Sequence, residues 1–97
     1  MNRKDCVERT FTVQGELGLH ARPAGRLVAA AGRFQCEIEV GRAGEWVSGR
    51  SVLSILSLAA GPGTVLSVRA TGVDAEAAVE TLGALIENPE EASGPPA

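Results

Sequence analysis

The stretch Gly18-Leu19-His20-Ala21-Arg22-Pro23-Ala24 marks the place where a loop leads into a helix. Pro23 has a fixed φ and no backbone N–H, and both properties suit the first turn of a helix. After Ala24, apolar residues recur at spacings of three, four and seven positions: Leu27, Val28 and Ala31. Because this spacing is typical of the buried face of a helix, a helix is predicted to begin between Ala21 and Pro23.

His20 is the only histidine in the chain and lies just before this predicted helix. A neutral imidazole has a free lone pair on one ring nitrogen, which suits a nucleophile, a proton shuttle or a metal ligand. A surface or capping histidine without chemistry is the alternative. A metal site is not expected, because there is no second histidine and Cys6 and Cys36 lie in separate strand-like segments without ligand spacing.

The position of His20 at the start of a helix favours an anionic ligand. The first N–H groups of a helix have no intrahelical partner, and the positive end of the helix dipole lies there. Ala21, Arg22 and Pro23 are therefore the candidate phosphate-binding residues. The guanidinium of Arg22 has the planar geometry that suits phosphate oxygens, although a solvated surface arginine remains the alternative interpretation.

Apolar and polar residues alternate in three segments outside this helix, which predicts β-strands over residues 7–13, 36–40 and 65–70. The turn signal Gly41-Arg42-Ala43-Gly44 precedes a short strand over residues 45–48 that pairs back as a hairpin. In this hairpin, Trp46 faces away from the core if Val47 faces inward. Val65 falls on the outward phase of its strand.

Two further helices are predicted from their caps. Ser51 is placed to cap a helix whose buried residues are Val52, Ile55, Leu56 and Ala59, and Gly61-Pro62-Gly63 ends that segment. Asp74 is placed to cap a last helix that Asn88-Pro89 stops. Its apolar face comprises Ala75, Ala78, Val79, Leu82, Leu85 and Ile86.

The predicted order β-α-β-β-α-β-α has one apolar face per strand. It implies an α+β fold, an open-faced two-layer sandwich in which three helices cover one face of a four-stranded antiparallel sheet. Residues 1–88 are expected to form a single domain, and residues 89–97 a flexible tail. No internal repeat or second domain is evident.

Composition excludes several classes of function. The net charge of −3, with two Phe and one Trp, offers no basic and aromatic face for nucleic acid. No apolar run approaches the roughly 18 residues of a membrane helix, and no signal peptide begins the chain, so a cytoplasmic protein without membrane insertion is expected. Cys6 and Cys36 are then reduced, and both are expected to be buried or half-buried packing groups.

The stretch Gly18 to Ala24 resembles the active-site signature of the histidine-containing phosphocarrier (HPr) family of the bacterial sugar phosphotransferase system. A second stretch, Ser48-Gly49-Arg50-Ser51-Val52-Leu53-Ser54-Ile55-Leu56-Ser57-Leu58, resembles the regulatory-serine helix of that family. The segment Ala70-Thr71-Gly72-Val73-Asp74 resembles the strand-to-helix junction that follows, so that the likeness spans about residues 6 to 88. The resemblance implies the strand order 1-4-2-3.

The resemblance also implies a function. His20 would accept a phosphoryl group, on its δ1 nitrogen, from phosphorylated enzyme I and pass it to a IIA-type acceptor. Arg22 and the helix N-terminus would stabilise the group during transfer. The chain would be a monomeric carrier without a cofactor, and not a stand-alone enzyme. The alternative is an HPr-like regulatory binding module that reports phosphoenolpyruvate supply to a kinase or transcription regulator without sugar transport.

Partner binding and regulation are predicted beside His20. Leu17, Leu19 and Leu53 are expected to form a small apolar patch rimmed by Arg22, Arg26 and Arg50, which would attract acidic partners. Each leucine could instead be an ordinary surface residue. By resemblance, Ser51 aligns with the serine modified by HPr kinase/phosphorylase, although it would serve as an N-cap in any case. Leu17 and Ser48 depart from the family pattern, and both bear on the orientation of His20.

Overall fold

The computed structural model describes residues 6–88, and within them strands and helices follow in the order that the sequence predicts. The elements are β1 (Cys6–Thr12), α1 (Ala21–Ala31), β2 (Cys36–Arg42), β3 (Glu45–Ser48), α2 (Val52–Leu56), β4 (Val65–Gly72) and α3 (Ala75–Glu87). The predicted tail over residues 89–97 lies outside the described residues, as do residues 1–5.

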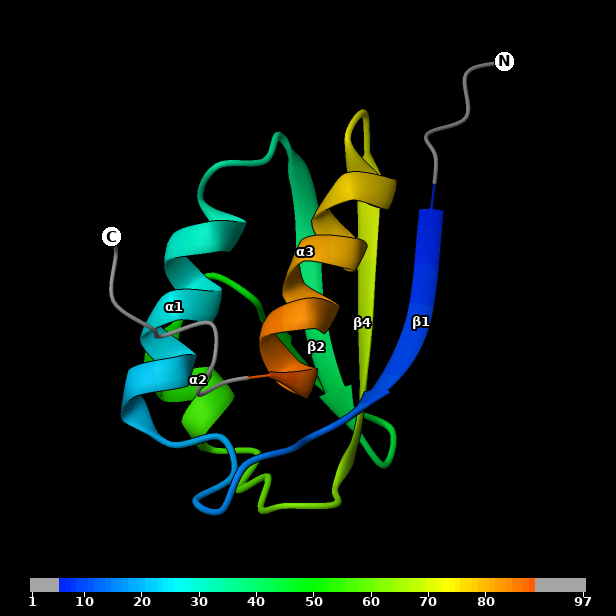
Figure 1. Cartoon of the computed structure of the whole chain (residues 1–97). Helices are drawn as coiled ribbons and strands as arrows, with labels where there is room; N and C mark the ends of the chain where they lie inside the picture. The colour runs from blue at the N-terminus through cyan, green and yellow to red at the C-terminus, as the bar shows by residue number, and fades with distance from the viewer. Residues whose placement is uncertain (1–5, 89–97) are drawn as a thin grey trace.

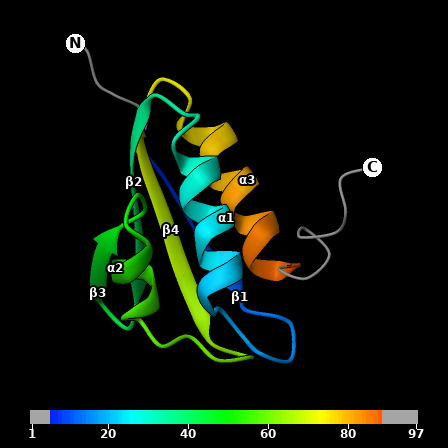
Figure 2. The same ribbon diagram turned by 90° about the vertical axis from the view of Figure 1, so that its left-hand side faces the viewer.

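The four strands form one antiparallel sheet in the order β1-β4-β2-β3, which confirms the predicted topology. All three helices lie on one face of this sheet, and the other face is open (Figures 1 and 2). Side chains alternate between the two faces of a strand, so every second residue of β2 and β4 reaches the core. The buried hydrophobic residues of these strands are Ile38, Val40, Leu66, Val68 and Ala70.

The open face carries Trp46, as predicted from the phase of β3. The guanidinium carbon of Arg69 lies 3.8 Å from the centre of the indole ring. Arg69 Nε also donates a hydrogen bond to Glu39 Oε1 at 2.7 Å. These contacts connect β2, β3 and β4 on the solvent side of the sheet. Val65 likewise lies outward, with 55% of its surface exposed.

The second helix is shorter than its apolar pattern predicts. It ends at Leu56, and Ala59 is exposed with a φ of 52°, so the prediction that Ala59 is buried is wrong. Leu58 is buried instead. Where the chain leaves the helical path, Arg42 Nη1 donates hydrogen bonds to the carbonyls of Leu58 and Ala59, at 2.7 and 2.9 Å.

One other expectation about a single residue is wrong, and another holds only in part. Cys6 is exposed, because it belongs to the outward phase of the edge strand β1 and lies opposite Thr71. Asp74 occupies the N-cap position of α3 but makes no capping hydrogen bond. Its Oδ2 accepts a hydrogen bond from the backbone N–H of Gln35 at 2.9 Å, which ties α3 to the connection between α1 and β2.

Candidate functional site

The loop before α1 is pressed against the segment that follows α2. The backbone N–H of Leu19 donates to the carbonyl of Ala60 at 2.9 Å, and the Leu19 side chain is 5% exposed. Gly18 adopts a φ of +67°, and a Cβ at this position would lie 2.7 Å from the carbonyl oxygen of Ala60. Only glycine suits both the conformation and the space. His20 therefore follows a backbone that is held firmly in place.

His20 is the N-cap residue of α1, which confirms that the helix begins at Ala21. Its backbone is extended, with φ −99° and ψ −167°, and its carbonyl accepts the Ala24 N–H at 3.0 Å. The His20 side chain makes no capping hydrogen bond and is half-buried. Capping therefore uses the backbone of His20 and leaves the imidazole available for chemistry.

The first turn of α1 supplies the groups that would face an anion. Ala21 and Arg22 occupy its first two positions, where backbone N–H groups have no intrahelical acceptor, and both residues are exposed. Pro23 has no N–H and is buried. The side chain of Arg26, one turn further along, is half-buried. Residues 20–22 thus combine an imidazole, two backbone donors and a guanidinium at the positive end of a helix dipole.

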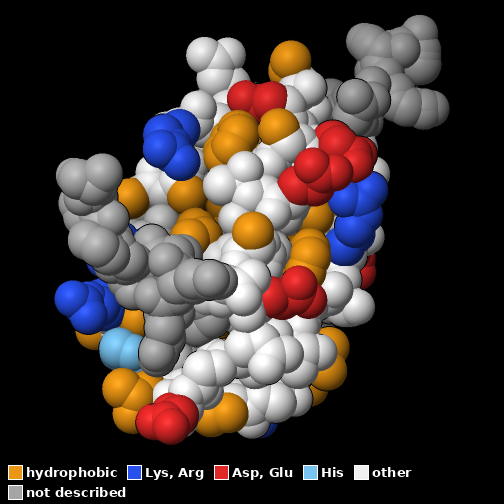
Figure 3. All heavy atoms as spheres, in the orientation of Figure 1, with side chains coloured by type: hydrophobic (Ala, Val, Ile, Leu, Met, Phe, Trp, Pro, Cys, Tyr) orange, Lys and Arg blue, Asp and Glu red, His pale blue; other side chains and the backbone are white. Residues whose placement is uncertain are grey.

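Helix α2 packs beside α1, so the Ser51 segment and the His20 segment share one side of the molecule (Figure 2). Ser51 caps α2: its Oγ accepts the backbone N–H of Ser54 at 3.2 Å, as predicted. Leu17 and Leu53 are 68% and 79% exposed. Figure 3 shows the single histidine side chain at the surface, beside hydrophobic and basic side chains.

Two members of the predicted interface make contacts that the sequence did not predict. Leu19 is buried, so the prediction that it belongs to an exposed apolar patch is wrong: its backbone bond to Ala60 turns the side chain into the core. Arg50 is not a free rim charge, because its guanidinium donates to three backbone carbonyls. The sequence offered no signal for these carbonyls, which lie 14 to 19 residues away along the chain.

Two groups with shifted pKa values lie away from His20: Asp74 at the start of α3 and Cys36 at the start of β2. The hydrogen bond from the Gln35 N–H lowers the pKa of the Asp74 carboxyl. Burial, followed by a hydrogen bond to Asp74, raises the pKa of the Cys36 thiol. Within residues 6–88, no group of three His, Cys, Asp or Glu side chains could hold a metal ion. In the same range, no helix has the length and apolar character to span a membrane.

Comparison with known proteins identifies the class to which this fold and histidine belong. The family model described as "PTS HPr component phosphorylation site" matches residues 7–88. Phosphocarrier protein HPr of Pseudomonas putida is 42% identical over 81 residues, covering 82% of this chain and 90% of that protein. HPr-like protein Crh of Halalkalibacterium halodurans is 38% identical over 81 residues, covering 84% and 96%.

A solved structure agrees with these sequences. The crystal structure of phosphocarrier protein HPr from Bacillus anthracis matches with a TM-score of 0.81 at 36% identity, covering 84% of this chain and 98% of that one. The chain therefore belongs to the HPr family of the phosphotransferase system, whose members are phosphocarrier proteins and not classical enzymes. This confirms the family resemblance seen in the two sequence motifs.

Proposed function

We propose that His20 is the phosphoryl acceptor of this chain, taking the group from phosphorylated enzyme I and passing it to a IIA-type acceptor. The observation that carries the proposal is the His20 imidazole at the N-cap of α1, which takes no part in capping. A family model named for a phosphorylation site spans this residue. On this proposal, residues 1–88 act as one cytoplasmic, monomeric domain that needs no cofactor, nucleic acid or membrane insertion.

The proposed step is an in-line displacement at phosphorus. The lone pair on Nδ1 of His20 forms the new N–P bond while the bond from phosphorus to the donor atom of enzyme I breaks, and that atom keeps the electron pair. Charge on the equatorial oxygens is stabilised by the N–H groups of Ala21 and Arg22 and by the Arg22 guanidinium. Pro23 holds the first turn in a helical conformation. The same geometry serves the transfer onward.

The test is incubation with phosphoenolpyruvate and enzyme I. Acid-labile phosphate is expected on the wild type and on Ser51→Ala, and none on His20→Ala. Arg22→Gln is expected to be labelled more slowly, by about tenfold or more, because it loses a charged donor to the transferring group. Absence of label on the wild type, or equal label on His20→Ala, would overturn the proposal.

Ser51 is proposed as a second, regulatory phosphorylation site for HPr kinase/phosphorylase. The support is its place at the start of α2, where the added negative charge is compatible with the helix dipole. A phosphate there would add about two negative charges beside Leu53 and oppose an acidic partner. Incubation with ATP and the kinase is expected to label the wild type and not Ser51→Ala; equal labelling of the two would remove Ser51 from this role.

The proposed partner surface consists of Leu17, Leu53, Arg22 and Arg26, because both leucines are exposed and the arginines would attract acidic enzyme I and IIA surfaces.

A second function is favoured by the similarity to an HPr-like protein named Crh: a regulatory module that reports phosphoenolpyruvate supply without sugar transport. Onward transfer separates the two. A labelled chain that transfers its phosphate to no IIA domain would support the regulatory module.

A further inference from the structure

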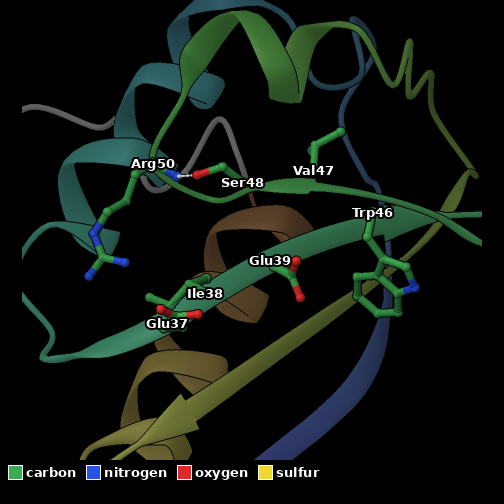
Figure 4. A pocket seen from close by; sticks show the side chains of 7 residues that line it. All are labelled: Glu37, Ile38, Glu39, Trp46, Val47, Ser48 and Arg50. Carbon is green, nitrogen blue, oxygen red and sulfur yellow. Dashed lines mark hydrogen bonds between the residues drawn. The ribbon is translucent and has the colours of Figure 1, made fainter.

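The guanidinium of Arg50 lies where three segments meet. Its Nη2 donates to the carbonyls of Ala31 and Phe34, at 3.0 and 2.8 Å, and its Nη1 donates to the carbonyl of Cys36 at 3.0 Å. Ala31 is the last residue of α1, and Cys36 is the first of β2. Figure 4 shows the Arg50 side chain extending away from Ser48 and Trp46. Because Arg50 directly precedes Ser51, its side chain joins the start of α2 to the C-terminal end of α1.

The segment that Arg50 introduces has little stability of its own. Helix α2 has five residues and only Ile55 of them is buried, and so short a helix is not stable in isolation. Its flanks are tied to the sheet: the Gly49 N–H donates to the carbonyl of Ile38 at 2.8 Å, and Arg42 holds the carbonyls of Leu58 and Ala59. Arg50 provides a side-chain connection from this segment to α1.

We infer that Arg50 is a positioning residue, which sets Ser51 and Leu53 relative to α1 and so relative to His20 at the other end of that helix. This inference deepens the proposed function and rests on it in one respect, that partners dock on α2. One of the three carbonyls, that of Ala31, lies at the negative end of the α1 dipole, where a cation is favourable, and it also accepts the Phe34 N–H at 3.2 Å. It acts through the geometry of a planar fork, which the single nitrogen of lysine does not reproduce.

The geometry of the fork distinguishes positioning from simple charge steering. Arg50→Lys keeps the positive charge and loses the three-way hydrogen bonding, whereas Arg50→Gln loses both. If Arg50 only attracted acidic partners, Arg50→Lys would behave as wild type. If Arg50 positions α2, the two variants share one phenotype. Arg33→Lys is the matched control, since Arg33 lies just after α1 and no ion pair or side-chain hydrogen bond of it is found within residues 6–88.

Two measurements test the inference on the full chain. The first is amide hydrogen exchange at Ile55, whose N–H bonds to the carbonyl of Ser51 at 3.0 Å, compared with Val68 in β4 as a reference for global opening. In both Arg50 variants, the exchange rate of the Ile55 amide is expected to rise about threefold or more, and that of the Val68 amide is expected to stay unchanged. The second is the rate of enzyme I-dependent labelling, where KM for the chain is expected to rise about three- to tenfold with kcat near wild type.

Each other outcome overturns the inference. Arg50→Lys equal to wild type in both measurements would leave only charge steering, and equal acceleration at Ile55 and Val68 would mean general destabilisation. A change in Arg33→Lys of the same size would show that the effect does not depend on the hydrogen bonds that Arg50 makes. If the wild type takes no label at all, the proposed function fails, while the exchange at Ile55 still decides whether Arg50 positions α2.

Discussion

At the scale of the single residue, the backbone of Gly18 decides how the His20 loop meets the rest of the molecule. Gly18→Ala is expected to lower the free energy of unfolding by about 1–2 kcal/mol or more, because the left-handed φ penalises a Cβ and the carbonyl of Ala60 leaves no room for one. Enzyme I-dependent labelling of His20 should slow in the same variant. Urea unfolding and the labelling assay measure the two effects.

Gly25 provides the matched control for Gly18. It lies within α1, and a Cβ there would meet no atom within 4 Å. Gly25→Ala is therefore expected to stabilise the chain by about 0.5–1 kcal/mol, as alanine favours the helix. Equal stabilities of the two variants would contradict the role assigned to Gly18.

The lowered pKa of Asp74 predicts that the stability of the folded chain depends on pH. Its pKa in the folded chain is lowered from the usual 3.8, so its contribution to stability is complete above that value and is lost as the pH falls through the lower, folded pKa. The wild type should be more stable than Asp74→Asn near neutral pH, and the difference should narrow below about pH 4. Thermal unfolding from pH 7 to pH 2 measures this, with Glu45→Gln as a control on an exposed carboxylate.

At the scale of the element, α2 depends on its cap, Ser51, and on Arg42 and Arg50, whose side chains bind the backbone next to it. Ser51→Ala removes the acceptor for the Ser54 N–H and is expected to cost about 1 kcal/mol of stability, whereas Ser51→Asp keeps an acceptor at the N-cap and should stay near wild type. Urea midpoints measure both variants. Equal losses in the two variants would show that the cap contributes little to α2.

Elements were predictable where the signal is local. Alternation along β2 and β4 and helical spacing after Ala24 and Asp74 predicted the strands and helices, because burial on one face repeats with the period of the backbone. The end of α2 and the partner of Asp74 were not predictable. Arg42 donates a hydrogen bond to the carbonyl of Leu58, 16 residues away, and Asp74 accepts one from the Gln35 N–H, 39 residues away. Contacts over such separations leave no periodic pattern in the sequence.

At the scale of the whole molecule, two exposed apolar side chains, Leu53 and Val73, lie on different parts of the surface. Leu53 lies on α2, which packs beside α1, whereas the exposed Val73 lies in the β4–α3 turn at the opposite end (Figure 1). Leu53→Glu is expected to weaken enzyme I binding by about tenfold or more without loss of stability, through a charge placed in the docking surface. Val73→Glu should bind as wild type.

Titration calorimetry with enzyme I, together with thermal unfolding of each variant, checks this prediction. Leu53 and Val73 are 79% and 88% exposed, so neither substitution removes core packing. Unchanged affinity of Leu53→Glu, or equal loss in both variants, would exclude the α2 surface as the docking site.

The sequence by itself determined the order of the elements, the sheet face that each strand buries, the cap at Ser51, the start of the first helix just after His20, and the family that the two motifs indicate. These features follow from residues close together in the chain, whose spacing repeats with the backbone. The tertiary structure decided which leucines reach solvent and what the arginines bind. Leu19 is buried because the folded chain brings Ala60 against its backbone. Arg50 binds three carbonyls because the fold brings the end of α1 to its guanidinium. Both contacts join residues that lie too far apart in the chain for a local pattern to encode.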